Sequence, residues 1–382
     1  MKLKSVFSLS VLILSSIAKL SGSIAQNNDE LIFSLLTYEK GEPLYAAFGH
    51  SAIRVANSQN NTDYVYNYGT LDLTSAGFYL SFLKGKLPYR LSRMPTSYVI
   101  EQNTLEQRTI IENRFILSEI EANSLLKILE LNYLPHNRTY YYDFFFDNCA
   151  TKIIQAIDTA THFKIKKEYP TYERKSFKKH IHQQLNTNPW VRLGIDILMG
   201  VRADRTATPT ETSFLPDHLL SLLLANPDYF EPNGNVLING ISQNEKKKRT
   251  TTWFFLAVFI SVLLLTYLEI KGMKKVRWLD HLLIWPAIII GFILLFLWVY
   301  SDLLIFGINL NLFWANPLLV VYLINKSIPN WFRILIVCSI LLSFIYSGFY
   351  FQDFAIIFYS TGVLVRFIQG TSNVNKSVPD TI

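Results

Sequence analysis

The sequence predicts an α+β exported domain followed by an all-α transmembrane bundle. Three observations support this fold class. Half of the 382 residues are hydrophobic, and the long apolar runs gather near the two ends of the chain. Residues 26–245 instead mix charged, β-branched and helix-forming stretches, as an ordinary globular domain does. The charged run NEKKKR at 244–249 separates this domain from the apolar segments that follow.

Residues 1–25 are predicted to be a signal peptide. Two lysines precede an apolar stretch, and Ser23 and Ala25 provide small side chains at the minus-three and minus-one positions before Gln26. An uncleaved anchor is the less favoured alternative, because a membrane span takes ~20 apolar residues. We therefore expect the domain at 26–245 to be exported.

Residues 250–370 are predicted to form a transmembrane domain of about five helices. The third and fifth apolar segments are short for a span of ~20 residues. The five segments are 253–270, 281–300, 309–324, 331–350 and 354–369.

The charges of the connecting loops predict the orientation of these helices. KGMKKVRWLD, NKSIPNWFR and the tail at 371–382 would lie in the cytoplasm if the domain is exported. The loops left outside, SDLLIFGIN and FQD, contain no Lys or Arg. This distribution follows the positive-inside rule. The net charge of +7 thus reflects topology, and nothing in the sequence indicates a nucleic-acid partner.

Cysteine usage points to chemistry in the exported domain. The chain has two cysteines, and Cys338 lies inside an apolar run. Cys149 is thus alone in the exported domain and has no partner for an internal disulfide. It precedes ATKIIQAID, a predicted helix, so it lies near a helix N-terminus, where the helix dipole favours a thiolate.

A thiolate needs a base or cation partner, and His50 has the most constrained setting of the seven histidines. It stands at the start of the strand SAIRVAN, which the polar loop SQNNT joins to DYVYNYG in a predicted hairpin. We expect most of the other histidines to be solvated at the surface: His136, His162, His180, His182 and His218. Zinc, phosphate-loop and serine-elbow spacings are absent from the sequence.

Each residue also has a structural interpretation, and the residues alone leave both open. A lone cysteine is commonly a small buried hydrophobe, and a histidine beside a strand is commonly a hydrogen-bonded core residue. Asp147 and Asn148 either shape the turn that presents the thiol or cap the following helix. The helix predicted at 117–134 begins with a capping box formed by Ser118 and Glu121.

Four segments together resemble the Lnb-type family. FGHSAIRV followed later by DNCATK is similar to the circularly permuted papain-like fold, in which a strand histidine precedes a cysteine at a helix N-terminus. GHSAIRV, YNYGTLD, PHNRTYYYDFFFDNCAT and LGIDILMGVRADRTATPTETSFLPDHL look like the Lnb-type periplasmic domain, and the C-terminal helices look like its membrane domain. The resemblance implies a multi-pass protein of the bacterial inner membrane with the domain in the periplasm.

The resemblance also implies an activity: an acyltransferase with a Cys-His catalytic pair. A fatty acyl chain would move from a phospholipid donor to the α-amine of a lipoprotein's N-terminal cysteine, without a cofactor or metal. Cys149 would be the nucleophile and His50 the general base. Asn67 is the expected third residue, although a shift of one residue in strand register would place Tyr66 or Tyr68 there.

Two other functions remain open at this point. A membrane-tethered cysteine peptidase or amidase of the cell envelope would use the same Cys149 and His50, with water in place of the amine. A non-catalytic membrane assembly factor would keep Cys149 as a structural residue. The aromatic run at 140–146 would either line an acyl path or form an ordinary buried strand.

Overall fold

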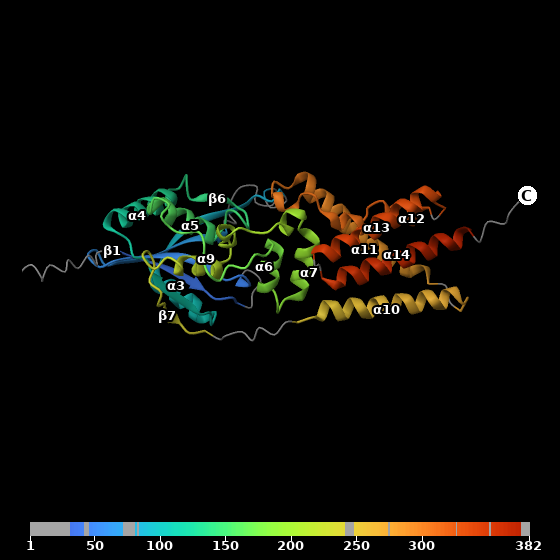
Figure 1. Cartoon of the computed structure of the whole chain (residues 1–382), viewed down its shortest axis with the longest axis horizontal. Coiled ribbons are helices and arrows are strands. Elements are labelled where there is room, and N and C mark those ends of the chain that lie inside the picture. The colour runs from blue at the N-terminus through green and yellow to red at the C-terminus, as the bar shows by residue number, and fades with distance from the viewer. Residues whose placement is uncertain are drawn as a thin grey trace, which may run out of the picture.

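The computed structural model describes residues 31–41, 46–71, 81, 84–240, 248–273, 276–325, 327–350 and 353–375. The predicted signal peptide and residues 376–382 of the predicted tail lie outside the described residues. Figure 1 shows an elongated molecule with a sheet domain at one end and a helix bundle at the other. The predicted α+β domain followed by a helical membrane bundle is confirmed.

The described part of the domain is built on a seven-stranded antiparallel sheet in the order β6-β4-β3-β2-β1-β5-β7. The predicted hairpin is confirmed: it joins β2 to β3, and the Asn57 side chain accepts hydrogen bonds from the loop amides of Gln59 and Asn60. The strands are β1 (Leu31–Tyr38), β2 (His50–Asn57), β3 (Thr62–Leu71), β4 (Leu87–Pro95), β5 (Ile110–Arg114), β6 (Thr139–Tyr142) and β7 (Asn235–Ile238).

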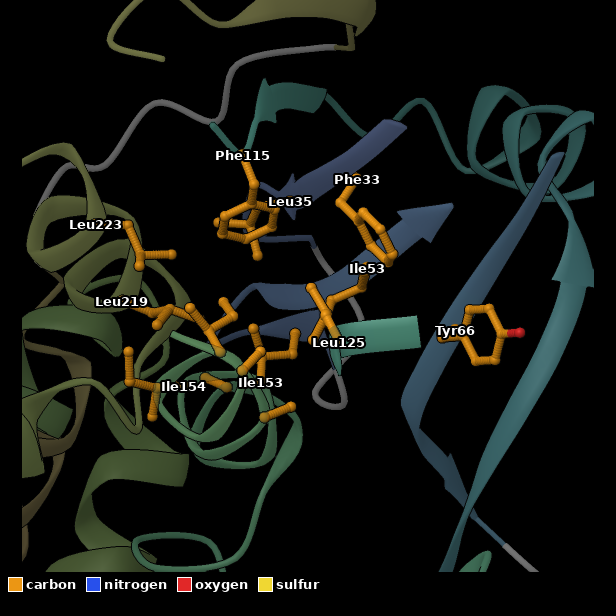
Figure 2. Close-up of a cluster of buried hydrophobic side chains, with 14 of the residues drawn as sticks. Phe33, Leu35, Ile53, Tyr66, Phe115, Leu125, Ile153, Ile154, Leu219 and Leu223 are labelled. Carbon is orange, nitrogen blue, oxygen red and sulfur yellow. The ribbon is translucent and has the colours of Figure 1, made fainter. Parts of the chain in front are cut away.

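Helices cover both faces of this sheet. One face packs against α4 (Glu119–Tyr133), α5 (Cys149–Ala160) and α9 (Pro216–Leu224), and the other against α3 (Thr96–Leu105). Figure 2 shows the strand residues Leu35 and Ile53 in one cluster with Ile153 of α5 and Leu219 of α9. Each is fully buried, which stabilises the fold by about 1.5–3 kcal/mol per large side chain.

The start of α4 follows its sequence signature. Ser118 accepts a hydrogen bond from the Glu121 amide, and the Glu121 carboxylate accepts one from the Ser118 amide at 3.0 Å. The predicted capping box is therefore confirmed. Because it fixes the entry of α4, it also helps to hold α5, which packs against α4 in the same core.

Four long apolar helices make up most of the described bundle. Their length and hydropathy suit a membrane crossing. The last one was expected to be marginal, but it extends past the predicted boundary at 370. The helices are α10 (Thr250–Ile270), α11 (Arg277–Tyr300), α13 (Asn330–Tyr350) and α14 (Phe354–Asn375).

The apolar segment at 309–324 does not form the predicted third long helix. It contains a single turn, η4 (Leu310–Phe313), and a short helix, α12 (Leu319–Ile324). Asn316 lies before Pro317, which disfavours helical geometry, and its side chain accepts a hydrogen bond from the Leu318 amide. Such a break is tolerated within a membrane where the chain is buried in protein, as Trp314 is here.

The broken segment still passes from one end of the bundle to the other. The Asn311 side chain donates to the Asp196 carbonyl beside the sheet domain, at 2.9 Å. At the far end, Tyr322 donates to Asp280, which also accepts from the buried Arg366. The five predicted segments thus alternate in direction, with one of them irregular.

Buried polar contacts join the domain to the bundle through α6 (Phe177–Gln184) and α7 (Pro189–Leu198), which lie between them in Figure 1. Lys178 pairs with Asp204 at 2.8 Å, and both side chains are almost fully buried. The Tyr346 hydroxyl of α13 donates to the same Asp204 carboxylate at 2.5 Å. Arg192 pairs with Asp353 at 2.9 Å. Removing one partner from such a pair costs roughly 3–5 kcal/mol, so these contacts hold the domain in a defined position on the bundle.

Candidate active site

Cys149 is the first residue of α5, as predicted, and Asn148 is the N-cap. The Asn148 side-chain oxygen accepts hydrogen bonds from the amides of Ala150 and Thr151, both at 2.9 Å. Its nitrogen donates to the carbonyls of Phe144 and Phe214 at 2.8 Å. Asn148 is thus a buried cap that fixes the turn before the thiol.

Asp147 lies beside this cap and also has a structural partner. Its carboxylate pairs with Lys152 at 2.7 Å, and its backbone pairs with Asp143 in a short bridge. These contacts close the loop that brings the chain from β6 into α5. Asp147 and Asn148 are both engaged in loop contacts, and Cys149 is the nucleophilic group that this loop presents to the cavity.

The His50 ring is oriented by Asn67 on the neighbouring strand. Its Nε2 atom lies 2.8 Å from Asn67 Oδ1, and that oxygen also accepts the Gly69 backbone amide at 2.7 Å. An amide N–H only donates, so the shared atom is the oxygen and Nε2 carries the proton. The nitrogen left to face the Cys149 thiol is Nδ1, the one able to hold the thiol proton.

The register of the hairpin excludes the two tyrosine alternatives for this place. Tyr66 donates to Glu130, and Tyr68 accepts a hydrogen bond from Asn132; both partners belong to α4. Their side chains therefore point to the face that packs on α4, whereas Asn67 points to the face of His50.

The thiol and the imidazole alter each other's pKa. Burial by itself would raise the pKa of the Cys149 thiol, but the His50 charge and hydrogen bond lower it on balance, helped by the amides of Ser51 and Ala150. Burial opposes a charge on His50, yet the Cys149 thiolate and the Asn67 bond raise the His50 pKa. This arrangement favours a thiolate–imidazolium pair, which is a nucleophile with an adjacent proton carrier.

A cavity of about 580 Å³ gives access to this pair. Part of the aromatic run contributes to its wall: Tyr142 and Phe144 line it, whereas Phe145 is buried and Tyr141 is exposed. Only the first three residues of the run, 140–142, belong to a strand, β6. Burial and the nearby Cys149 charge raise the pKa of Tyr142, so its phenol stays protonated and able to donate.

Three further residues of the site were not found from the sequence. The Tyr38 ring lies 5.3 Å from the His50 ring, and Arg108 lies over the Tyr38 ring at 5.5 Å. Gly69 also lies against the His50 ring. The segment YNYGTLD already contained Gly69. Tyr38, at the end of β1, and Arg108, in the connection between α3 and β5, lie far from Cys149 in sequence and gave no local signal.

Replacing Gly69 with alanine is expected to displace the His50 ring. A Cβ atom at this position would lie 2.3 Å from His50 Cε1 and 3.1 Å from Asn67 Oδ1, so the ring has to move. We expect the rate of Cys149 alkylation by iodoacetamide at neutral pH to fall by at least about tenfold, because the thiolate loses its partner. Gly194→Ala is the matched control, since a Cβ there meets nothing within 4 Å. Unchanged alkylation in Gly69→Ala would show that the ring position does not control the thiol.

The expectation for the other histidines is wrong for three of them. His180 is fully buried and packs edge-on against His218 at 4.9 Å between ring centroids. His218 lies 3.0 Å from the Tyr169 hydroxyl, and His182 pairs with Asp196 at 2.6 Å. Burial lowers the pKa of His180 to about 4. His136 and His162 are exposed, as expected.

The fold and this site define a membrane protein whose extramembrane α+β domain carries a paired thiol and imidazole beside its own helix bundle. The sequence profile of the Lnb N-terminal periplasmic domain matches residues 25–180, and that of the Lnb transmembrane domain matches 243–376. The chain belongs to the Lnb family, and its N-terminal domain is periplasmic. No curated protein and no solved structure matches it.

Proposed function

We propose that this protein is a lipoprotein N-acyltransferase of the bacterial inner membrane. Its donor is a phospholipid, and its acceptor is the α-amine of a lipoprotein's lipidated N-terminal cysteine. The observation that carries the proposal is the Cys149–His50–Asn67 set, which opens into a cavity of a periplasmic domain packed on its own membrane helices. Cys149 is the nucleophile, His50 the general base and acid, and Asn67 the residue that orients His50.

In the first step the Cys149 thiolate attacks the carbonyl carbon of a phospholipid acyl ester. A carbon–sulfur bond forms and the ester carbon–oxygen bond breaks, while His50 gives its proton to the departing lysophospholipid oxygen. The start of α5 and the protonated Tyr142 hydroxyl stabilise the negative charge that develops on the carbonyl oxygen. The enzyme is left as a thioester with a neutral His50.

In the second step the acceptor enters as a neutral amine. Its nitrogen attacks the thioester carbon, His50 takes the amine proton, and Cys149 leaves as the thiolate. The product is an amide, and the thiolate–imidazolium pair is restored. In each cycle His50 therefore gives one proton to the lysophospholipid and takes one proton from the acceptor amine. The hydrogen bond to Asn67 matters because it leaves Nδ1 as the ring nitrogen that carries out both transfers.

The position of the cavity suits two lipid substrates. Its wall residues Phe144 and Phe214 belong to an aromatic cluster that continues through Phe145 and Phe177. Ile305, in the connection that follows α11 of the bundle, is buried in the same cluster. This apolar continuity between the cavity wall and the bundle supports a thiol that acts near the membrane surface, where the surrounding aromatic rings would limit the access of water to the thioester.

Mass spectrometry of lipoprotein N-termini from cells with and without this protein tests the proposal. We expect the N-linked acyl group to disappear when the protein is absent. In a second arm, purified protein given phospholipid but no lipoprotein should gain one acyl mass that neutral hydroxylamine removes. Unchanged N-termini together with cleavage of envelope peptides would support the peptidase or amidase function instead. Unchanged N-termini with no thioester would support an assembly factor.

A further inference from the structure

We propose that Arg108 binds the phosphate group of the donor lipid and so places its acyl ester at Cys149. The inference rests on the proposed function and adds a part of the site that recognises the donor headgroup. Arg108 lies between α3 and β5, far from Cys149 in sequence, yet it lines the same cavity as Cys149 and His50.

Arg108 and His50 contact the same tyrosine ring. The guanidinium lies over the Tyr38 ring at 5.5 Å, and the His50 ring lies 5.3 Å from it. The cation is close enough to oppose the protonation of His50. An anion held by Arg108 would therefore lie next to the reacting pair, as the phosphate of a glycerophospholipid lies near its acyl esters.

The guanidinium is held in place by the protein. Its Nε atom donates to the Glu39 carbonyl at 2.7 Å, the Tyr38 ring supports its face, and the residue is only 9 % exposed. A guanidinium carries its N–H donors in a planar fork that matches phosphate. A cation fixed in this way loses little conformational entropy when it binds an anion.

The remainder of the cavity is divided in a way that suits an amphipathic donor. On the α3 side, Gln102 and Asn103 accompany Arg108, whereas Tyr89, Tyr142 and Phe144 line the part contributed by β4 and the chain before α5. Glu106 also lines the α3 side but is exposed, so water screens its charge. A volume of about 580 Å³ suits the phosphoglycerol part and the reacting ester, with the acyl chains extending towards the membrane.

The test compares two acyl donors with the full-length protein in detergent. We expect Arg108→Gln to lower the acylation rate from a phospholipid by about 10- to 100-fold, the usual effect of losing a charge-assisted hydrogen bond. The rate with a neutral p-nitrophenyl acyl ester should fall much less than the phospholipid rate, because that donor has no phosphate; any change it shows reports the effect of the lost cation on His50. Arg108→Lys should recover part of the loss, since a lysine supplies charge without the planar fork.

Arg93→Gln is the matched control. Arg93 also lies over tyrosine rings and pairs with Glu130 at 2.9 Å, but it does not line the cavity. An equal loss on both donors in Arg108→Gln would overturn the inference and make Arg108 a positioning residue for His50. An unchanged phospholipid rate would overturn it as well.

A binding experiment separates this inference from the proposed function. In the Cys149→Ala protein, a short-chain phospholipid should bind more weakly by about 10-fold or more when Arg108 is also replaced by glutamine. A diacylglycerol of the same chain length should bind equally to both proteins. Equal phospholipid affinity in the two proteins would refute the role of Arg108, even if the enzyme proved to have another acyl acceptor. Wild-type protein that acylates with neither donor would instead refute the proposed function.

Discussion

Replacing Cys149 with alanine is expected to reduce N-acyl transfer by on the order of 10⁴-fold or more, the scale seen when a covalent nucleophile is removed. The methyl group cannot form the thioester, and no second thiol lies in the described part of the domain. The measurement is transfer from phospholipid to a purified diacylated lipoprotein, followed by the mass of its N-terminal peptide. Abundance and membrane insertion should stay near normal, since alanine fits the first turn of a helix.

The chain supplies its own control for this experiment. Cys338 lies on α13 and is exposed on the bundle surface, so Cys338→Ala should retain full activity. Comparing the two variants shows whether activity depends on the Cys149 thiol in particular or is lost when either thiol is removed. If Cys149→Ala kept full transfer activity, Cys149 would have no part in the mechanism, and the peptidase alternative would fail with the transferase.

Features that depend on neighbouring residues were predictable from the sequence. The polar loop between two β-branched runs gave the β2–β3 hairpin, and Ser118 with Glu121 gave the start of α4. The position of Cys149 near the start of α5 followed from the helical stretch ATKIIQAID that comes directly after it. Each of these signals is local, because caps and hairpin loops are specified within a few residues.

Features that depend on register or on distant strands were not predictable in the same way. Asn67 faces His50, and a shift of one residue would have exchanged it for a tyrosine. Tyr38 and Arg108 reach the site only because β1 lies between β2 and β5 in the sheet. Residue 69 has to be a glycine because a side chain there would collide with the His50 ring. This requirement comes from the packing of the folded site, and no sequence pattern indicates it.

The errors have physical causes of the same kind. His180 and His182 were expected at the surface because lysines surround them, but α6 packs between the domain and the bundle and buries this face. The segment 309–324 is apolar enough to span the membrane, yet its Asn-Pro step breaks the helix. The irregular chain is stable there because it is packed against neighbouring helices. Composition measures hydrophobicity well, but it does not reveal which polar groups find partners in the folded protein.

Replacing His50 with alanine is expected to slow alkylation of Cys149 by at least about tenfold at pH 6.5 and to stop thioester formation. In the wild type the lowered pKa of Cys149 gives a thiolate above that pKa, and the raised pKa of His50 gives an imidazolium below its own. The ion pair exists where the thiol is deprotonated and the imidazole still carries both of its protons. It is lost through thiolate protonation as the pH falls and through imidazolium deprotonation as the pH rises. Without His50, burial raises the pKa of the thiol, and an ordinary thiol of pKa about 8.5 is already mostly protonated at pH 6.5.

The pH profile of alkylation by iodoacetamide, measured in the Cys338→Ala background, distinguishes the two states. The wild-type rate should depend less steeply on pH than the His50→Ala rate, which should rise about tenfold per pH unit, as it does for a thiol well below its pKa. Asn67→Ala keeps the imidazole but not its orientation, so its profile should lie between the two. A His50→Ala profile that overlays the wild type would show that the thiolate is stabilised by the start of α5 alone, and His50 would then have no role in activating Cys149.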